Sequence, residues 1–199
     1  MVLGLGNPGP RYERTRHNAG FLVAEGLRAA GQGRGWSVLG ERQETRLRIG
    51  AYDLVAARPL TYMNRSGVAA RDLLAAYALL PAEMLVVADD VALSFGTLRI
   101  RPRGGAGGHR GLLSIAEEIG TLDFPRLRLG VGAPPDDGDL AEFVLRGVEG
   151  EEWDAYQREI VQGVEAVRTI CSEGLERAMN RFNPAVPPAG PAIGEKPAA

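Results

Sequence analysis

The sequence has little of the residue types on which many enzyme classes depend: its 199 residues include one cysteine, one lysine and two histidines. A single cysteine cannot form an internal disulfide, which fits a reducing compartment. The lysine is Lys196, so no Walker-type phosphate loop occurs in the preceding residues. None of the five serines stands in a Gly-x-Ser-x-Gly motif, so the nucleophile elbow of α/β hydrolases is missing.

A zinc site is not indicated either, because one cysteine and two histidines form no recognisable ligand motif. The adjacent Asp89 and Asp90 follow an apolar run and are expected at the tip of a strand, where successive side chains point to opposite faces. Two carboxylates placed in this way chelate a cation poorly. We therefore expect neither a metal nor another cofactor.

Long apolar segments are absent too. Residues 1–20 lack the charged start and apolar stretch of a signal peptide, and no run is long enough to span a membrane. We expect a soluble, cytoplasmic protein that does not bind membranes. Apolar residues still make up 45% of the chain, enough to build the core of one domain. We expect this domain to cover residues 1–183, and the five prolines of residues 184–199 predict a disordered Pro/Ala-rich tail.

The net charge of −2 hides an uneven distribution of arginine. No acidic residue lies between residues 95 and 110, and this segment and residues 11–16 are both rich in arginine. Two basic segments beside one candidate site favour a nucleic-acid partner. For each segment alone, the general use of arginine in place of lysine is an equally good explanation. The arginines concerned are Arg11, Arg14 and Arg16 in the first segment and Arg99, Arg101, Arg103 and Arg110 in the second.

Hydrophobic periodicity predicts strands that alternate with helices. Apolar or alternating segments predict strands at 1–5, 43–49, 53–58, 84–88, 97–101 and 126–131. Apolar residues at helical spacing predict helices at 18–30, 66–80, 112–118 and 149–171. This alternation is typical of an α/β fold. We expect a single domain with a mixed, mostly parallel twisted sheet sandwiched by helices.

Residues 4–9 read Gly-Leu-Gly-Asn-Pro-Gly and imitate the GxGxxG signature of dinucleotide-binding proteins. In that signature a helix opens at the third glycine, so that its free N–H groups face the pyrophosphate. Here prolines stand on both sides of that glycine, and the next helical pattern begins about nine residues later. We infer instead a strand, a tight turn, a polar loop and a histidine, His17, at a helix start. This order brings Asn7 and His17 to one mouth and predicts a reaction centre there.

The residues expected at this mouth suit hydrolysis by an activated water. A histidine such as His17 accepts a proton near neutral pH, and a carboxylate such as Asp89 orients it. Asparagine both donates and accepts hydrogen bonds, which suits Asn7, Asn18 and Asn64 for holding amides and a developing oxyanion. Other interpretations stay open: His17 as a capping or core residue, Asp89 as a solvated strand-end acid, and Asn64 as a helix N-cap.

Several segments, taken in order over residues 1–183, together resemble the bacterial-type peptidyl-tRNA hydrolase family. The opening motif and the Met-Asn-x-Ser-Gly segment are the most specific, whereas the glycine loop alone is a weak match. The matching stretches are 4–9 with Tyr12, 17–21, 58–67, 89–90, 107–112, 124–132 and 178–183.

The resemblance implies a monomeric enzyme with a phosphorylase/hydrolase-like fold that cleaves the ester between a peptide and the 3′ end of tRNA, recycling tRNA from stalled translation. It gives His17 the role of general base and Asp89 that of its support, while Asn7 positions substrate and helps to hold the developing charge. It also implies contacts with the acceptor stem and 3′ end. The binding residues that it indicates are Tyr12, Met63 and Asn64 for the peptide and terminal ribose, and Arg99, Arg101 and Arg126 for tRNA phosphates.

The sequence departs from the family pattern at Arg110, where asparagine usually follows the glycine-loop histidine, and at Tyr62 and Ala92, where phenylalanine and an acid are common. Arginine donates but does not accept hydrogen bonds, so we expect Arg110 to serve substrate binding rather than chemistry. The alternative function is an RNA-binding factor of the same fold without hydrolase activity. That function predicts loss of His17 or Asp89, and both are present. A nucleotide-dependent oxidoreductase would rest only on the imitated glycine signature.

Overall fold

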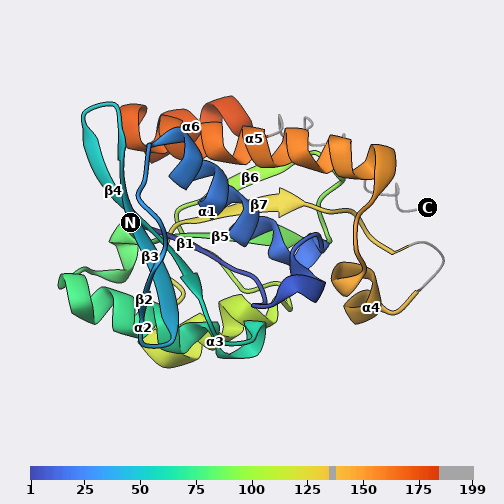
Figure 1. Ribbon diagram of the computed structural model, residues 1–199, viewed down its shortest axis with the longest axis horizontal. Helices are drawn as coiled ribbons and strands as arrows, with labels where there is room; N and C mark the ends of the chain where they lie inside the picture. Colours follow the sequence, from blue (N-terminus) through green and yellow to red (C-terminus); the bar gives the residue numbers. More distant parts are fainter. Residues whose placement is uncertain (135–137, 184–199) are drawn as a thin grey trace, which may run out of the picture.

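Seven strands form one mixed sheet in the computed structural model, which describes residues 1–134 and 138–183. In chain order they are β1 (Val2–Gly4), β2 (Ser37–Leu39), β3 (Arg42–Ile49), β4 (Tyr52–Pro59), β5 (Leu85–Asp90), β6 (Leu98–Arg101) and β7 (Arg126–Gly130). Their order across the sheet is β2-β3-β4-β1-β5-β7-β6 (Figure 1). The central strands β4, β1, β5 and β7 are parallel, whereas β2, β3 and β6 extend the edges through antiparallel pairs.

Helices cover both faces of this sheet (Figure 1). They are α1 (Ala19–Ala30), α2 (Ser66–Tyr77), α3 (Arg110–Ile119), α4 (Leu140–Leu145), α5 (Gly150–Glu173) and α6 (Leu175–Phe182). Helices α1, α5 and α6 share one apolar cluster with the sheet, which includes Val23 and Leu129. Helices α2 and α3 share a second cluster on the opposite face, which includes Leu73 and Ile115. The three layers confirm the predicted α/β fold, with the sheet between helices.

Every strand and helix predicted from periodicity is present, with ends that differ by a few residues. Helix α2 is shorter than predicted because Ala78 adopts a left-handed conformation (φ +50°) that ends it. Three short elements, β2, α4 and α6, were not predicted. None of the helices in the described ranges has both the length and the apolar character of a membrane span. The predicted tail, residues 184–199, lies outside the described residues.

The glycines of the opening segment serve close packing and a turn. A Cβ on Gly4 would lie 2.1 Å from the carbonyl oxygen of Gly20, so only glycine lets the start of α1 press against β1. A Cβ on Gly6 would lie 2.6 Å from the ring of Phe21. Gly9 has φ +106°, a conformation that favours glycine, and the chain then turns through a short 3₁₀ helix. Because α1 begins only at Ala19, no α-helix opens at the third glycine as a dinucleotide site requires.

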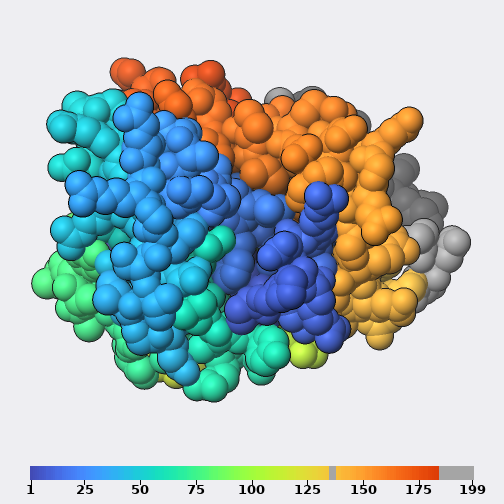
Figure 2. Space-filling model, in the orientation of Figure 1, coloured from blue at the N-terminus to red at the C-terminus, as the bar shows by residue number. Residues whose placement is uncertain are grey.

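The parallel strands deliver polar residues to one edge of the sheet. The chain leads from the end of β1 to Asn7, and β5 ends with Asp89 and Asp90. Residues 10–18 cross this edge, and the segment around α4 lies beside them (Figure 2): the N–H of Val148 donates to the carbonyl of Arg14 at 2.8 Å. Segments far apart in sequence therefore enclose the carboxyl ends of the strands, where open α/β sheets bind their ligands.

Candidate active site

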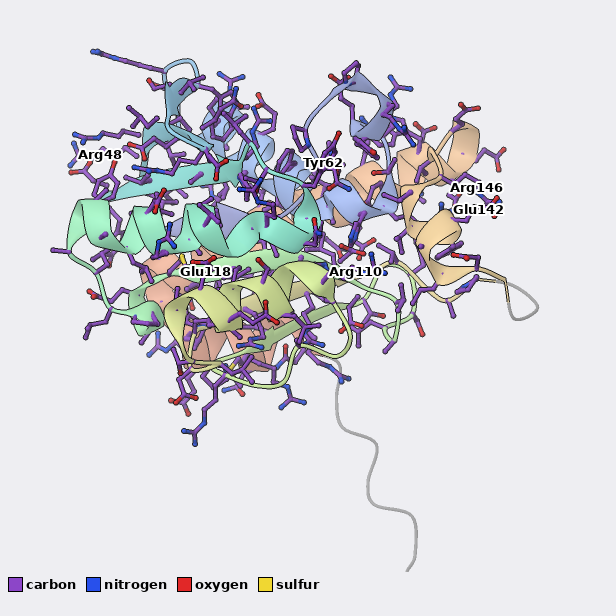
Figure 3. All side chains as sticks on the ribbon, turned by 90° about the horizontal axis from the view of Figure 1, so that it is seen from below. Arg48, Tyr62, Arg110, Glu118, Glu142 and Arg146 are labelled. Atoms are coloured by element: carbon purple, nitrogen blue, oxygen red, sulfur yellow. The ribbon has the colours of Figure 1, made fainter. Side chains whose placement is uncertain are left out.

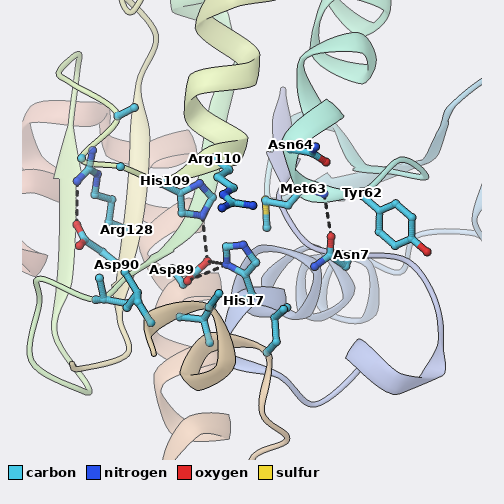
Figure 4. Close-up of a pocket in the computed structure, with 18 of the residues that line it drawn as sticks. Asn7, His17, Tyr62, Met63, Asn64, Asp89, Asp90, His109, Arg110 and Arg128 are labelled. Atoms are coloured by element: carbon cyan, nitrogen blue, oxygen red, sulfur yellow. Dashed lines mark hydrogen bonds and ion pairs between the residues drawn. The ribbon is translucent and has the colours of Figure 1, made fainter. Parts of the chain in front are cut away.

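A cavity of about 520 Å³ opens at this edge of the sheet (Figure 4). Its floor holds the strand-end carboxylates, and its rim comes from the opening loop, the segment before α2, the glycine loop before α3, and α4. Seven of the site residues predicted from the sequence line it: Asn7, Tyr12, His17, Met63, Asn64, Asp89 and Arg110. The elements that converge here are distant in sequence, so the fold assembles the site.

His17 and Asp89 lie in direct contact. The Nδ1 atom of His17 is 2.9 Å from Oδ1 and 3.0 Å from Oδ2 of Asp89. A carboxylate accepts hydrogen bonds, so Nδ1 carries the proton and donates it. The Nε2 atom of the same ring then holds a lone pair on the side of the cavity. This tautomer and orientation are those of a general base.

His109 contacts the same carboxylate from the other side, with its Nε2 atom 3.1 Å from Oδ1 of Asp89. Its Nδ1 atom caps α3 by accepting the N–H groups of Gly111 at 3.2 Å and Leu112 at 3.3 Å. Nδ1 therefore carries no proton, and Nε2 donates to Asp89. His109 was not among the predicted site residues, although it is one of two histidines and lies in a segment that matches the family pattern.

The buried Asp89 is held as a carboxylate. Desolvation raises its pKa, but His17 and then His109 oppose this effect through charge and hydrogen bonds, and the pKa lies below its usual range. Its side chain is 3% exposed. A fixed negative charge under two imidazoles therefore persists throughout the neutral range and can stabilise an imidazolium that forms during catalysis.

Asn7 is oriented by backbone contacts. Its side-chain oxygen accepts the N–H of Met63 at 2.8 Å, so the amide can only turn its nitrogen toward the cavity. The side chain of Asn18 fixes the Asn7 backbone from below, accepting its N–H at 2.8 Å and donating to its carbonyl at 3.0 Å. Asn18 thus supports the site without lining it, and Asn7 presents a rigid N–H donor.

Aromatic and apolar side chains form the rim beside Asn7. The rings of Tyr12 and Tyr62 meet edge to face, with centroids 6.4 Å apart. Met63 is buried, whereas Asn64 is exposed at the rim. Asn64 precedes α2 by two residues and makes no capping bond, so the interpretation as an N-cap is wrong. Its amide is open to a ligand in the cavity (Figure 4).

The cluster of His17, Asp89 and His109 has the donor types of a metal site, with ligand atoms within 4.8 Å of one another. The hydrogen bonds argue against metal binding. To coordinate through Nε2, neutral His109 would need its proton on Nδ1, which already faces the N–H groups of Gly111 and Leu112. Asp90 does not help, because it points away from Asp89 and pairs with Arg128 at 2.8 Å. The arrangement suits proton transfer rather than metal coordination.

Two arginines expected on the basic surface are buried instead. Arg126 is 1% exposed, and its guanidinium donates to the carbonyls of Gly104, Gly105, Leu122 and Phe124. Burial and the neighbouring charge of Arg128 lower the pKa of Arg126 to about 10. The prediction that Arg126 contacts tRNA phosphate is therefore wrong, because its donors hold the glycine loop. Arg16, from the other basic segment, is also 1% exposed and pairs with Glu152.

Arg99 and Arg101 lie outside the cavity, on the edge strand β6. Residues two apart in a strand share a face, and Leu98 and Ile100 are buried on the other side. Arg99 stands opposite Arg128 of β7 in the sheet. The structure thus leaves Arg99 partly exposed and Arg101 exposed, beside the glycine loop that leads to the cavity.

Comparison with known proteins identifies the family. A sequence model described as peptidyl-tRNA hydrolase matches residues 1–189. The chain belongs to the peptidyl-tRNA hydrolase family. Similar members include the peptidyl-tRNA hydrolase of Elusimicrobium minutum (strain Pei191), 42% identical over 185 residues and matched over 92% of this chain and 98% of that protein. That of Aquifex aeolicus (strain VF5) is 41% identical over 183 residues, with 92% and 95% covered.

Solved structures of the family share the fold. The crystal structure of peptidyl-tRNA hydrolase from Acinetobacter baumannii matches with a TM-score of 0.84 and 32% sequence identity, over 92% of this chain and 93% of that one. The resemblance recognised in the sequence is thereby confirmed, and so is the fold class. The cluster of His17, Asp89 and His109 is consistent with the catalytic site of a peptidyl-tRNA hydrolase.

Proposed function

We propose that this protein hydrolyses the ester between a peptide and the 3′ end of tRNA, with His17 as the general base. The observation that carries the proposal is the contact between Nδ1 of His17 and both oxygens of Asp89, at 2.9 and 3.0 Å. It leaves Nε2 free to take a proton from a water in the cavity. An ester needs only a positioned water and a donor for the oxyanion, which this site contains.

In the proposed reaction His17 first accepts a proton and later donates it. His17 Nε2 removes a proton from water as the oxygen attacks the ester carbonyl, and Asp89 stabilises the resulting imidazolium. The Nδ2 group of Asn7 donates to the carbonyl oxygen as negative charge develops there. When the tetrahedral intermediate collapses, the imidazolium returns its proton to the departing ribose oxygen. His109 acts as a positioning residue, because its Nε2–H holds Asp89 beneath His17.

The substrate is bound by the rim and by the basic edge. Tyr12, Met63 and Asn64 receive the peptide and terminal ribose, and Arg110 contacts the 3′ end. The exposed guanidiniums of Arg99 and Arg101 bind phosphates of the acceptor stem, which as A-form RNA is recognised by shape and backbone. We further propose that residues 1–183 act as one domain, and that the protein works as a monomer in the cytoplasm.

The test compares release and binding in His17→Ala and His17→Gln. Each variant should release N-acetyl-aminoacyl residues from tRNA about 10²–10⁴-fold more slowly than the parent, because the general base is lost. Binding of the same tRNA, measured by filter retention, should stay within a few-fold. Near-parental release would show that His17 is not the base. If the parent protein binds tRNA and releases nothing, the alternative of an RNA-binding factor is correct.

A further inference from the structure

The charges that line the cavity are neutralised in pairs, with one exception. Both oxygens of Asp89 accept from His17, and Oδ1 also accepts from His109. Asp90 accepts the N–H of Ala92 at 2.9 Å and pairs with Arg128. Each carboxylate in the lining therefore already has a charged or hydrogen-bonding partner within the protein.

Arg110 is the exception. It is exposed at the first position of α3 and lines the cavity, and its side chain has no hydrogen bond or ion pair with any residue of 1–134 or 138–183. Its guanidinium points into the space between His109 and Met63, above His17 (Figure 4). Glu142 of α4 and Arg146, which follows that helix, lie on its outer side (Figure 3) and do not line the cavity. The reaction centre thus carries an unpaired positive charge.

The scissile carbonyl must lie between His17 Nε2 and Asn7 Nδ2, and the substrate's α-nitrogen is only two bonds from that carbonyl carbon. The state of this nitrogen distinguishes two substrates. In aminoacyl-tRNA it is an ammonium, which has hydrogens to donate and a positive charge; in peptidyl-tRNA it is a neutral amide next to a carbonyl that accepts. A guanidinium has five donors and no acceptor, so it binds the amide carbonyl but repels the ammonium.

Building on the proposed function, we propose that Arg110 is a specificity-determining residue: it selects substrates whose α-nitrogen is acylated and rejects free aminoacyl-tRNA. This role differs from a phosphate contact. A phosphate contact strengthens both substrates equally, because their tRNA is the same. Rejection of the ammonium acts on one substrate only.

The experiment measures kcat/KM for N-acetyl-phenylalanyl-tRNA and for phenylalanyl-tRNA, and takes the ratio of the two. Arg110→Gln should lower the ratio about tenfold, mainly by faster cleavage of the free aminoacyl ester, since two like charges in one half-exposed site repel by roughly that factor. Arg110→Lys keeps the charge and should keep most of the ratio. Arg71→Gln, on α2 away from the cavity and paired with Glu118, is the matched control for loss of a surface arginine and should leave the ratio unchanged.

A pH series adds a readout that a structural role would not move. From about pH 6 to about pH 8.5 the substrate ammonium, with an ordinary pKa of about 8, loses its proton and with it the repulsion. The parent's ratio should fall over this range, whereas that of Arg110→Gln should change less. Ionisation of groups on the enzyme is common to both substrates and cancels in the ratio.

An equal loss of kcat/KM on both substrates in Arg110→Gln would overturn the inference and make Arg110 a tRNA contact alone. A ratio preserved by Gln but not by Lys would overturn it as well, because charge would then not be the cause. Failure of the parent to cleave even the acetylated substrate would instead refute the hydrolase function on which the inference rests.

Discussion

Glu159 is buried where α5 packs against the sheet. We predict that replacing it raises the free energy of unfolding. Its carboxyl is 2% exposed, and neither oxygen has a hydrogen-bond partner in the part of the chain that the structure describes. Desolvation raises its pKa from the ordinary 4.5 to about 8, an effect that the backbone N–H groups of Gly96 and Gly130 only partly offset. Both N–H groups already donate to carbonyls of the chain, at 3.2 and 2.8 Å.

The sign and size of the effect follow from linkage. Below pH 4.5 the carboxyl is protonated in folded and unfolded protein alike, so it adds no pH dependence. As the pH rises from 4.5 to 8, the unfolded chain ionises while the folded chain holds its proton, and stability falls. At pH 7 the loss is about 3–4 kcal/mol, from ~1.4 kcal/mol for each of the roughly 2.5 pH units passed. Above pH 8 the loss levels off near 5 kcal/mol, a large fraction of a domain's stability.

Glu159→Gln keeps the shape and removes the ionisation. The free energy of unfolding is measured by urea unfolding, followed by tryptophan fluorescence, at a series of pH values. The difference between variant and parent should grow by about 3 kcal/mol in favour of the variant between pH 5 and pH 8. All other titrating groups are common to both proteins and cancel in the difference. Glu165→Gln is the matched control, because Glu165 is an exposed residue of the same helix in a surface pair with Arg168. The free energy of unfolding of this control should stay within about 1 kcal/mol of that of the parent at every pH. A flat difference for Glu159→Gln would refute the reasoning.

Two further predictions concern catalysis and tRNA binding. Asp89→Asn should lower kcat by about 10²-fold or more and leave KM within a few-fold, because the imidazolium of His17 loses its counter-charge and its fixed tautomer; steady-state kinetics check this, and an unchanged kcat would reduce Asp89 to a strand-end acid. The double change Arg99→Ala with Arg101→Ala should raise KM for full tRNA substrates, spare small peptidyl-nucleotide substrates, and flatten the salt dependence of binding by about 0.7–0.9 per lost phosphate contact. Equal weakening of both substrate classes would mean that these arginines shape the site instead.

The long elements and the centre of the site, Asn7, His17 and Asp89, could be predicted from local patterns. The apolar run before Asp89 predicts a buried strand, and in an open α/β sheet the end of such a strand faces the ligand site. The prolines around Gly9 exclude a dinucleotide loop without any tertiary information. The elements that escaped prediction are short: β2 has three exposed residues and α4 has six residues in all. Segments of this size show too few turns or alternations for a period to be seen.

Which arginines are buried could not be predicted from the sequence, because their burial depends on contacts with residues that are distant in sequence. In sequence, Arg126 alternates with apolar residues as a solvent-facing strand residue does, and Arg16 belongs to a basic run. In the fold, carbonyls of the glycine loop surround Arg126, and Arg16 lies over the ring of Phe143 at 4.4 Å. Arg99 and Arg110 have the same local signature and remain accessible. Local charge density therefore indicates a basic surface but not which guanidiniums are free to bind.

The role of His109 escaped prediction for a related reason, and it shows how the site works. Most polar groups around the cavity hold one another: Asn18 fixes the Asn7 backbone, the N–H of Met63 donates to the side-chain oxygen of Asn7, and the N-terminus of α3 fixes the tautomer of His109. After these bonds are counted, the groups in the described residues nearest Asp89 that remain free toward the substrate are the lone pair of His17 Nε2, the N–H of Asn7 and the guanidinium of Arg110, while the amide of Asn64 stays open at the rim. His17 Nε2 accepts a proton and the other two donate, so these groups can activate water and stabilise an oxyanion, and the charge of Arg110 repels an ammonium as proposed. In this site the requirements of the chemistry and the rejection of an unblocked substrate therefore have one physical origin.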